Sequence, residues 1–584
     1  MKSKIFVLVM LAVLLLPHAA AFASESAASD VLVDVAQANA DKLGFITLLP
    51  PLIAIVLAFI TKNVVTSLFV GILSGSIILQ FSGVNILGTL VGAFTDFVER
   101  MLEVLSDSWN AGIMLQCLTI GGVIALVAKM GGARAIAEYL AKRAKSPRSA
   151  QLVTWILGLF IFFDDYANSL IVGPIMRPVT DKLRISREKL AFIVDATAAP
   201  IAGMAIISTW IGYELSLIRD AFQNGIGVEI DAMGFFLSSL PYRFYNIFVL
   251  GFIIFTIIFL KEFGPMYKAE SRARLTGKVL GDNAQPMVAS EITELEPKPG
   301  IKLSIWNAII PIGTLIVGAL VGFYYDGFKA IMAGNDGTLI ELINNSPFSF
   351  DAIQQAFSKS DASVVLFQAA LLATIVALIM GVGRKIFKLS EGIETWVNGS
   401  KSLMITAVIL MLAWGLSSVI KELGTSKYLV SVLNDVIPDF LLPTIVFVLG
   451  GVISFSTGTS YGTMGILMPL AIPLAYSISG ADMNFVIVSG SAVLTGAILG
   501  DHCSPISDTT ILSSMGTACD HIDHTKTQLW YALFVGGCAI LFGYLPAGLG
   551  VPVYILLPIG LAVVGATLLI FGKKVRAYKP CFRI

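Results

Sequence analysis

The sequence predicts an all-α polytopic membrane protein built from inverted-topology repeats with two broken or re-entrant helical hairpins. Composition is the first observation, because 56% of the residues are hydrophobic and only 13% are charged, whereas soluble domains carry about 25% charged residues. Apolar stretches long enough to cross a bilayer, or nearly so, recur along the chain. A polar, proline-containing pattern also occurs twice at membrane depth. The lipid bilayer is therefore an expected partner, and a formal net charge of zero gives no reason to expect nucleic acid.

The N-terminus resembles a secretory signal peptide over residues 1–23. Lys2 and Lys4 precede an apolar run, and 21–23 reads Ala-Phe-Ala, which fits the small-x-small cleavage rule. We expect this segment to be cleaved, with an uncleaved extra helix as the alternative. Residues 24–43 then form an external N-terminal segment. The five cysteines show no paired spacing, so neither a disulfide framework, a resident metal nor a cofactor is expected.

Apolar spans divide the rest of the chain into two repeats. They lie near 44–61, 64–82, 111–129, 190–212, 242–260, 305–325, 362–381, 402–421, 484–500, 529–547 and 551–571. Residues 150–180 and 441–478 are each too long for one span and are interrupted in the middle, which favours hairpins. We predict repeat 1 over 44–260, a cytoplasmic linker over 261–304, repeat 2 over 305–547, and a final helix with a cytoplasmic tail over 548–584.

The repeated pattern lies in these hairpins. Residues 164–169, followed by Pro174 and Pro178, correspond to 459–463, followed by Pro469 and Pro473, at a constant offset of 295 (461 − 166). A second pair of segments, 199–209 and 504–514, corresponds at an offset of 305 (505 − 200). Polar residues and proline are costly at membrane depth unless they line a site. Paired interrupted helices in two halves of one chain indicate the substrate site of a secondary transporter.

The distribution of lysine and arginine predicts that the two halves have opposite orientations. Basic connections are expected in the cytoplasm, and those with one basic residue among several acids outside. The first kind comprises 129–149, 177–189, 384–401 and the tail after 572, and the second comprises 83–110 and 213–240. The 150–180 hairpin then starts and ends inside, whereas the 441–478 hairpin starts and ends outside.

Asp164 and Asp165 are the first candidates for chemistry. They follow an unbroken apolar run, where two adjacent carboxylates repel each other and bind a proton or a cation readily. Competition between the two ligands is the minimal chemistry of exchange. The alternative is a helix end capped by aspartate at the interface. Polar residues recur at the corresponding position as Thr459-Ser460, which favours the functional interpretation, and Asn168 lies on the same break.

The densest polar segment at membrane depth is 500–510. It offers Asp501, Asp508 and several hydroxyls, and its counterpart in the first half contains Asp195. Hard cations such as Na⁺ bind several oxygen ligands. The alternative is a cytoplasmic loop with ordinary turns. The hydroxyl-rich residues 454–460 fit a cation ligand set, an anion site at a half-helix N-terminus, or small-residue helix packing.

Cys519-Asp-His-Ile-Asp-His524 places two histidines three positions apart. We predict a solvated, locally capped cytoplasmic loop here, with a pH sensor as the alternative.

Residues 500–514, with 519–524 after them, resemble the NhaC-type sodium/proton antiporter family of the ion transporter superfamily, as do 163–168 and 458–463. The resemblance covers about residues 45–570. It implies an inverted-repeat fold and Na⁺/H⁺ exchange in the bacterial cytoplasmic (inner) membrane. The family also includes exchangers of organic anions or amino acids, so the motifs leave the substrate open.

We therefore expect a multi-pass Na⁺/H⁺ antiporter, not an enzyme, that binds Na⁺ and H⁺ at a midplane site and works by alternating access. The predicted site comprises Asp164, Asp165, Asn168, Asp195, Thr459, Ser460, Asp501, Ser504, Ser507, Asp508 and Thr509. We leave open whether it is a monomer or a homodimer.

Three alternatives remain. An H⁺- or Na⁺-coupled exchanger of small organic anions or amino acids is the main one, but the hairpins contain only one basic residue, Arg177, which favours a cation. The inverted two-half layout argues against a channel. An intramembrane aspartyl protease would need its second acid in a full-length span of its own.

Overall fold

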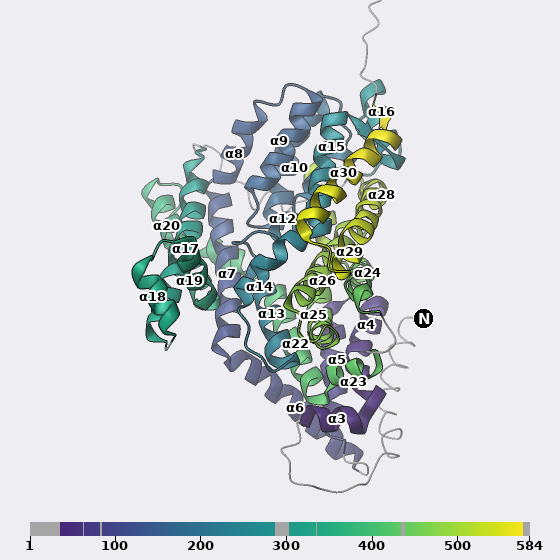
Figure 1. Cartoon of the computed structure of the whole chain (residues 1–584). Helices are drawn as coiled ribbons and strands as arrows, with labels where there is room; N and C mark the ends of the chain where they lie inside the picture. Colours follow the sequence, from purple (N-terminus) through teal and green to yellow (C-terminus); the bar gives the residue numbers. More distant parts are fainter. Residues whose placement is uncertain are drawn as a thin grey trace, which may run out of the picture.

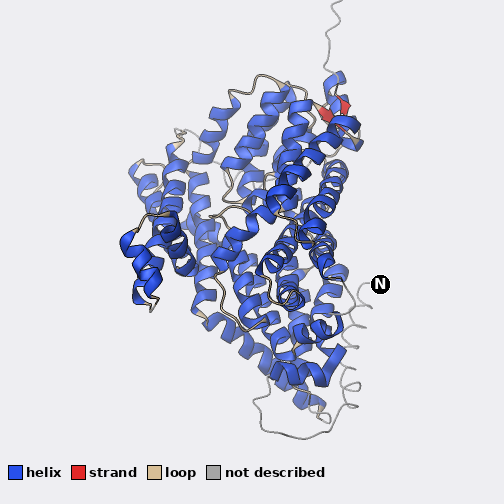
Figure 2. Cartoon of the chain, viewed as in Figure 1, coloured by secondary structure: helices blue, strands red, loops and turns tan. Residues whose placement is uncertain are grey.

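A computed structural model describes residues 35–61, 63–81, 85–286, 303–334, 336–433 and 438–575. Almost all of them are helical (Figures 1 and 2). By length and composition, ten helices of the described chain can cross a membrane. The prediction of an all-α polytopic membrane protein is confirmed. The predicted signal peptide lies outside the described residues.

The first half of the chain contains helices α3 to α16. They are α3 (Val35–Leu43), α4 (Leu49–Thr61), α5 (Val64–Leu79), α6 (Ile86–Ser106), α7 (Ser108–Lys129), α8 (Gly132–Ala141), α9 (Pro147–Phe160), α10 (Asp165–Lys182), α11 (Arg187–Ala196), α12 (Ala199–Ala202), α13 (Ile211–Gly225), α14 (Ala232–Ser239), α15 (Phe244–Phe259) and α16 (Gly264–Thr276).

The second half contains helices α17 to α30. They are α17 (Trp306–Ala333), α18 (Gly337–Asn345), α19 (Phe350–Lys359), α20 (Ala362–Gly383), α21 (Leu389–Ser402), α22 (Met404–Leu423), α23 (Thr425–Leu433), α24 (Leu442–Thr457), α25 (Ser460–Ile478), α26 (Met483–Cys503), α27 (Asp508–Thr517), α28 (His521–Ala539), α29 (Leu545–Gly548) and α30 (Val553–Phe571). Two short strands, β1 (Lys261–Glu262) and β2 (Lys573–Lys574), pair antiparallel.

Helices α9 and α10 form the first hairpin, and its tip lies beside the end of α11. Gly158 near the end of α9 packs so closely against Thr197 that an added Cβ would lie 2.2 Å from the threonine hydroxyl. A short turn joins α10 to α11 at the other end. The two arms therefore run in opposite directions, and α9 runs parallel to α11.

Helices α24 and α25 form the second hairpin, which packs on α26 in the same way. Gly450 packs against Gly496, and Gly500 approaches the backbone of Gly451, so α24 runs parallel to α26. Helix α25 runs antiparallel to α26, because Ser460 bonds to Asp501 while Ile472 lies near Gly490. The turn between the arms uses Gly458 at φ +69°, a left-handed conformation that glycine adopts without strain.

Contacts between the halves show that the repeats are inverted. Helix α10 runs parallel to α27, since Tyr166 bonds to Asp508 and Gly173 packs on Gly516. In the same way α25 runs parallel to α13, since the rings of Tyr213 and Tyr461 lie 4.4 Å apart and Gly225 packs on Pro473. Because α10 opposes α11 and α25 opposes α26, the broken spans of the two halves point in opposite directions.

Two predicted segments differ from expectation. The apolar stretch 190–212 was predicted as one span, but α11 ends at Ala196 and α13 begins only at Ile211. Pro200 explains part of this break, because proline removes a helical hydrogen bond. The first part of the predicted linker is also folded, since α16 packs on α28 and its Arg272 binds Glu188 at 2.9 Å.

Candidate functional site

The hairpin tips place two helix N-termini inside the protein. Asp164 caps α10 and accepts a hydrogen bond from the Ala167 amide at 2.6 Å. Thr459 caps α25 in the same extended conformation and accepts from the Gly462 amide at 3.4 Å. The repeated motif is therefore a repeated helix cap. The capping interpretation is correct for Asp164, but the cap is only 5% exposed and lies within the protein.

The first hairpin tip contacts α27. The Tyr166 hydroxyl donates a hydrogen bond to the Asp508 carboxylate, and the hydroxyls of Ser169 and Ser513 lie 3.0 Å apart. Asp165 is buried and interacts electrostatically with Asp164 and Asp508. Asp508 itself is exposed at this contact. It occupies the first position of α27.

The second hairpin tip contacts α26. Ser460 donates its hydroxyl to Asp501 Oδ2 at 2.7 Å and its amide to the same oxygen at 3.3 Å. Asp501 is buried and interacts electrostatically with Asp508. Acidic side chains of α26 and α27 thus meet the tips of both hairpins.

The predicted hydroxyls have different partners. Ser507 caps α27, and its hydroxyl lies 3.0 Å from that of Thr509. Ser504 donates to the Phe455 carbonyl at 2.7 Å, so it joins α26 to α24. The structure therefore brings Ser507 and Thr509 beside Asp508, and Ser504 takes part in helix packing.

Asn168 lies on α10 of the first hairpin, and Asp195 lies on α11 of the broken span that the hairpin packs against. Asn168 donates to the Thr197 carbonyl at 2.6 Å and to that of Gly158 at 3.3 Å, which joins the hairpin to the unwound segment. Asp195 accepts a hydrogen bond from the Gln528 amide at 2.5 Å, and it interacts electrostatically with Asp501.

Several buried oxygens around this region have no hydrogen-bond partner among the described residues. They are Asn168 Oδ1, Asp195 Oδ1, Thr209 Oγ1, Ser454 Oγ and Asp501 Oδ1. Leaving such a group unpaired costs about 1–3 kcal/mol, and it requires a structural or functional explanation. Unpaired oxygens beside carboxylates are suited to a hard cation.

A cavity of about 620 Å³ reaches the first hairpin tip. Asp164 and Tyr166 line one part of it, and Leu512 lies one helical turn beyond Asp508. Lys129 at the end of α7 lines another part and pairs with Glu391 of α21 at 3.7 Å. At the level of sequence, only basic residues within the two hairpins were considered. Lys129 was therefore not included, because α7 lies outside the hairpins in the sequence and reaches the cavity only in the folded protein.

The residues around Glu214 lie inside the protein. Trp210 and Tyr213 are both buried and pack on Tyr461. Glu214 is fully buried and pairs with Arg243 at 2.7 Å, with no exposed side-chain surface on either partner. An ionisable residue inside an apolar segment usually has a partner of opposite charge, and this is the sequence signal that could have indicated the Glu214–Arg243 pair.

The interpretation of 519–524 as a solvated loop is wrong for Cys519 and His524, which are both buried. Local capping is correct, since Asp520 caps α28 and accepts from the Asp523 amide at 2.9 Å. Helices α11 and α27 pack over this segment, which the sequence could not indicate.

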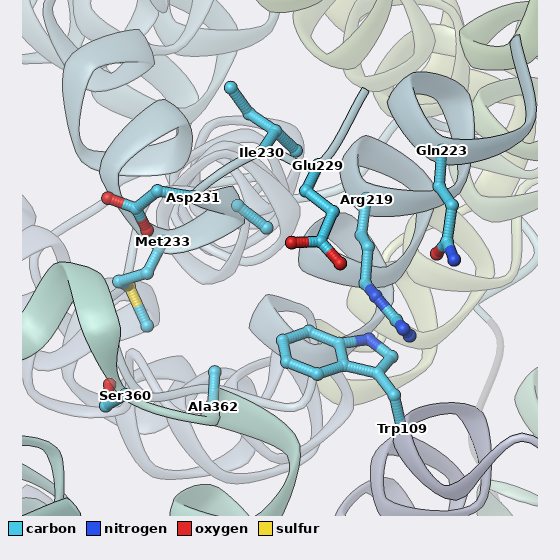
Figure 3. A pocket seen from close by; sticks show the side chains of 10 residues that line it. Trp109, Arg219, Gln223, Glu229, Ile230, Asp231, Met233, Ser360 and Ala362 are labelled. Atoms are coloured by element: carbon cyan, nitrogen blue, oxygen red, sulfur yellow. The ribbon is translucent and has the colours of Figure 1, made fainter. Parts of the chain in front are cut away.

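A second, smaller pocket of about 200 Å³ lies between the ends of α7, α13, α14 and α20 (Figure 3). The Arg219 guanidinium lies 4.8 Å from the centre of the Trp109 ring, and Glu229 and Asp231 are among the residues that line the pocket. None of the predicted site residues lines it.

An inverted pair of hairpins whose tips meet carboxylates on broken spans defines a secondary active transporter. The profile of the Na⁺/H⁺ antiporter family matches residues 4–205 and 201–548. This chain therefore belongs to the Na⁺/H⁺ antiporter family, and it is a multi-pass bacterial membrane protein.

Individual relatives agree with this assignment. An uncharacterized protein of Haemophilus influenzae is 34% identical over 506 residues, covering 86% of this chain and 90% of that protein. A malate-2H(+)/Na(+)-lactate antiporter of Bacillus subtilis is 34% identical over 94 residues, covering 16% of this chain and 19% of that protein. The crystal structure of the Alcanivorax borkumensis YdaH transporter has a TM-score of 0.51 at 12% identity, covers 84% of this chain and 99% of that one, and shows similarity of fold alone.

Proposed function

We propose that the protein exchanges Na⁺ for protons at the carboxylates between its two hairpin tips. The observation that carries this proposal is the meeting of Asp165 and Tyr166 with Asp508, and of Ser460 with Asp501. Like charges this close repel, and either a bound cation or a bound proton relieves the repulsion. Only one of the two ligands is then favoured at a time, which is the condition for exchange.

The unpaired oxygens support a cation as the ligand. Asn168 Oδ1 and Asp501 Oδ1 are buried and accept no hydrogen bond within the described chain. We assign Na⁺ to these oxygens together with the carboxylates of Asp165 and Asp508. Asp195 is bonded to Gln528 of α28, and we assign it to proton binding.

Alternating access would use the inverted hairpins. Movement of the hairpins relative to α26 and α27 would separate one tip from its carboxylate while the other stays closed. The cavity beside Asp164 and Tyr166 would give access from the end of the protein that carries Lys129, which the distribution of basic residues predicts to be cytoplasmic.

A small organic anion is the second candidate substrate. A cavity of about 620 Å³ falls in the range of small-molecule sites and exceeds the needs of a bare cation. Lys129 in its wall could pair with a carboxylate of the substrate. The relative that is named as a malate and lactate antiporter supports this candidate.

Purified protein in liposomes with a trapped pH dye tests the proposal. Asp165→Asn and Asp501→Asn should each abolish the proton flux that external Na⁺ drives, because each removes an exchanging carboxylate. Asp482→Asn is the matched control, since Asp482 caps α26 from an exposed position and asparagine caps helices equally well.

In the unmodified protein the apparent Na⁺ affinity should weaken by about tenfold for each pH unit of acidification, if one proton leaves per Na⁺ bound. Wild-type exchange by both site variants would refute the carboxylate role. Proton flux driven by malate or lactate and indifferent to Na⁺ would favour the organic anion instead.

A further inference from the structure

A buried hydroxyl joins the two histidines at the start of α28. Ser514 Oγ of α27 lies 2.8 Å from His524 Nδ1 and 3.0 Å from His521 Nδ1. Ser514 and His524 are fully buried, whereas His521 is partly exposed. The three side chains therefore form a continuous line from the protein interior to its surface.

The other nitrogen of each histidine must carry a hydrogen. His521 Nε2 lies 2.7 Å from the Pro505 carbonyl, which can only accept. His524 Nε2 lies 2.9 Å from Gln528 Oε1. The orientation of the Gln528 amide is fixed, because its nitrogen donates to the His502 carbonyl. Both imidazoles thus donate through Nε2.

The Ser514 hydroxyl has fewer hydrogens to donate than there are acceptors around it. When both imidazoles are neutral, each Nδ1 needs a donor, and the Thr510 carbonyl also lies 2.8 Å from the same hydroxyl. One hydroxyl hydrogen can serve only one of them. One added proton on either imidazole gives both Nδ1 atoms a hydrogen-bond partner. The protonated imidazole donates from Nδ1 to Ser514 Oγ, and the Ser514 hydroxyl donates to Nδ1 of the neutral imidazole.

The inner end of the line reaches Asp195. His524 Nε2 lies 3.8 Å from Asp195 Oδ2, and Asp195 Oδ1 has no partner among the described residues. The other titratable groups that interact with the two histidines are His502 of α26 and Asp520. An approach of about 1 Å would bring His524 into hydrogen-bond contact with Asp195.

We propose that His521, Ser514 and His524 form the proton path between Asp195 and the predicted cytoplasmic surface. His521 receives a proton from water and passes its Nδ1 proton to Ser514, which gives its own hydroxyl proton to His524 Nδ1. The His524 imidazolium then turns about its Cα–Cβ and Cβ–Cγ bonds, releases this same Nδ1 proton to the Asp195 carboxylate, and turns back. Nε2 keeps its hydrogen throughout, so the first tautomer is restored.

This inference rests on the proposed Na⁺/H⁺ exchange, which supplies the demand for protons. Ser514→Ala keeps both imidazoles but removes the link, and His521→Gln keeps a donor to Pro505 without a site for the extra proton. In proteoliposomes both variants should slow Na⁺/H⁺ exchange by about 100-fold, the scale of positioned proton transfer. Exchange of labelled Na⁺ for Na⁺ without a pH gradient should change by less than about twofold, since the cation site is intact.

Thr517→Val is the matched control. Within the described residues, the buried Thr517 hydroxyl on the same helix bonds only to the carbonyls of Ser513 and Ser514, so both exchange modes should match the unmodified protein. Ser514→Ala and His521→Gln variants that move protons at the unmodified rate would overturn the path. Loss of both modes in His521→Gln, at its partly exposed position, would also overturn it, because the residue would then be structural.

The outcomes separate the two proposals. If the unmodified protein exchanges Na⁺ for Na⁺ but moves no protons, the proposed function fails and the path fails with it. If the unmodified protein and both path variants move protons equally, only the path fails.

Discussion

Adding one methyl group at Gly500 should separate the second hairpin from Asp501. A Cβ at this position would lie 2.1 Å from the Gly451 carbonyl oxygen and 2.6 Å from the Phe455 amide nitrogen. Ordinary contact begins at 3.4 Å, so α24 and α26 must part by about 1.3 Å, because backbone atoms cannot rotate away as side chains can. Overpacking of this kind costs about 1–3 kcal/mol.

The separation should also weaken ion binding. If the hairpin follows α24, the Ser460–Asp501 hydrogen bond, now 2.7 Å, opens to about 4 Å and is lost. A hydrogen bond to a charged group contributes about 1.5–3 kcal/mol, which corresponds to about 10- to 160-fold in affinity. We expect Gly500→Ala to raise the Na⁺ concentration for half-maximal proton flux by that factor, and to lower the melting temperature in detergent.

Gly537→Ala in α28 is the matched control, because no atom of the described chain lies within 4 Å of the added Cβ. Both variants carry the same change in helix propensity, so the difference between them isolates the contact with α24. Unchanged Na⁺ dependence in Gly500→Ala, or an equal defect in both variants, would refute the packing argument.

The buried Glu214–Arg243 pair gives a second prediction: Arg243→Met alone should destabilise the protein by about 3–5 kcal/mol, and adding Glu214→Leu should recover most of it. Thermal unfolding in detergent measures both steps, and additive losses would show that the two side chains are not coupled. Cysteine labelling tests the orientation. A cysteine replacing the exposed Lys182 should react only from the cytoplasm, and one replacing the exposed Glu229 only from outside, over a low background because the four described native cysteines are buried. The reverse pattern would contradict the predicted topology.

The repeated motif shows how far sequence reasoning reached. The constant offset between Tyr166 and Tyr461 predicted two related breaks, and both breaks are helix caps at hairpin tips. The prediction succeeded because capping and turn formation depend on a few neighbouring residues. The long apolar run before Asp164 also indicated that this residue lies within the protein and not at the membrane–water interface.

Contacts between distant segments were beyond sequence reasoning. The partners of Tyr166, Glu214 and His524 lie on other helices, 342, 29 and 10 residues away along the chain. The error at His524 arose because its segment was assigned to a loop without knowledge of the helices that cover it.

The sequence by itself determined that this protein lies in a membrane, that it has two halves, and where each half is broken. These properties follow from composition, from helical length against bilayer thickness, and from local turn chemistry. Only the tertiary structure decided which carboxylates meet, that Lys129 lines the cavity beside them, and that His524 is buried. The physical reason is that packing joins helix faces through many weak contacts across the chain, and no single segment carries that information.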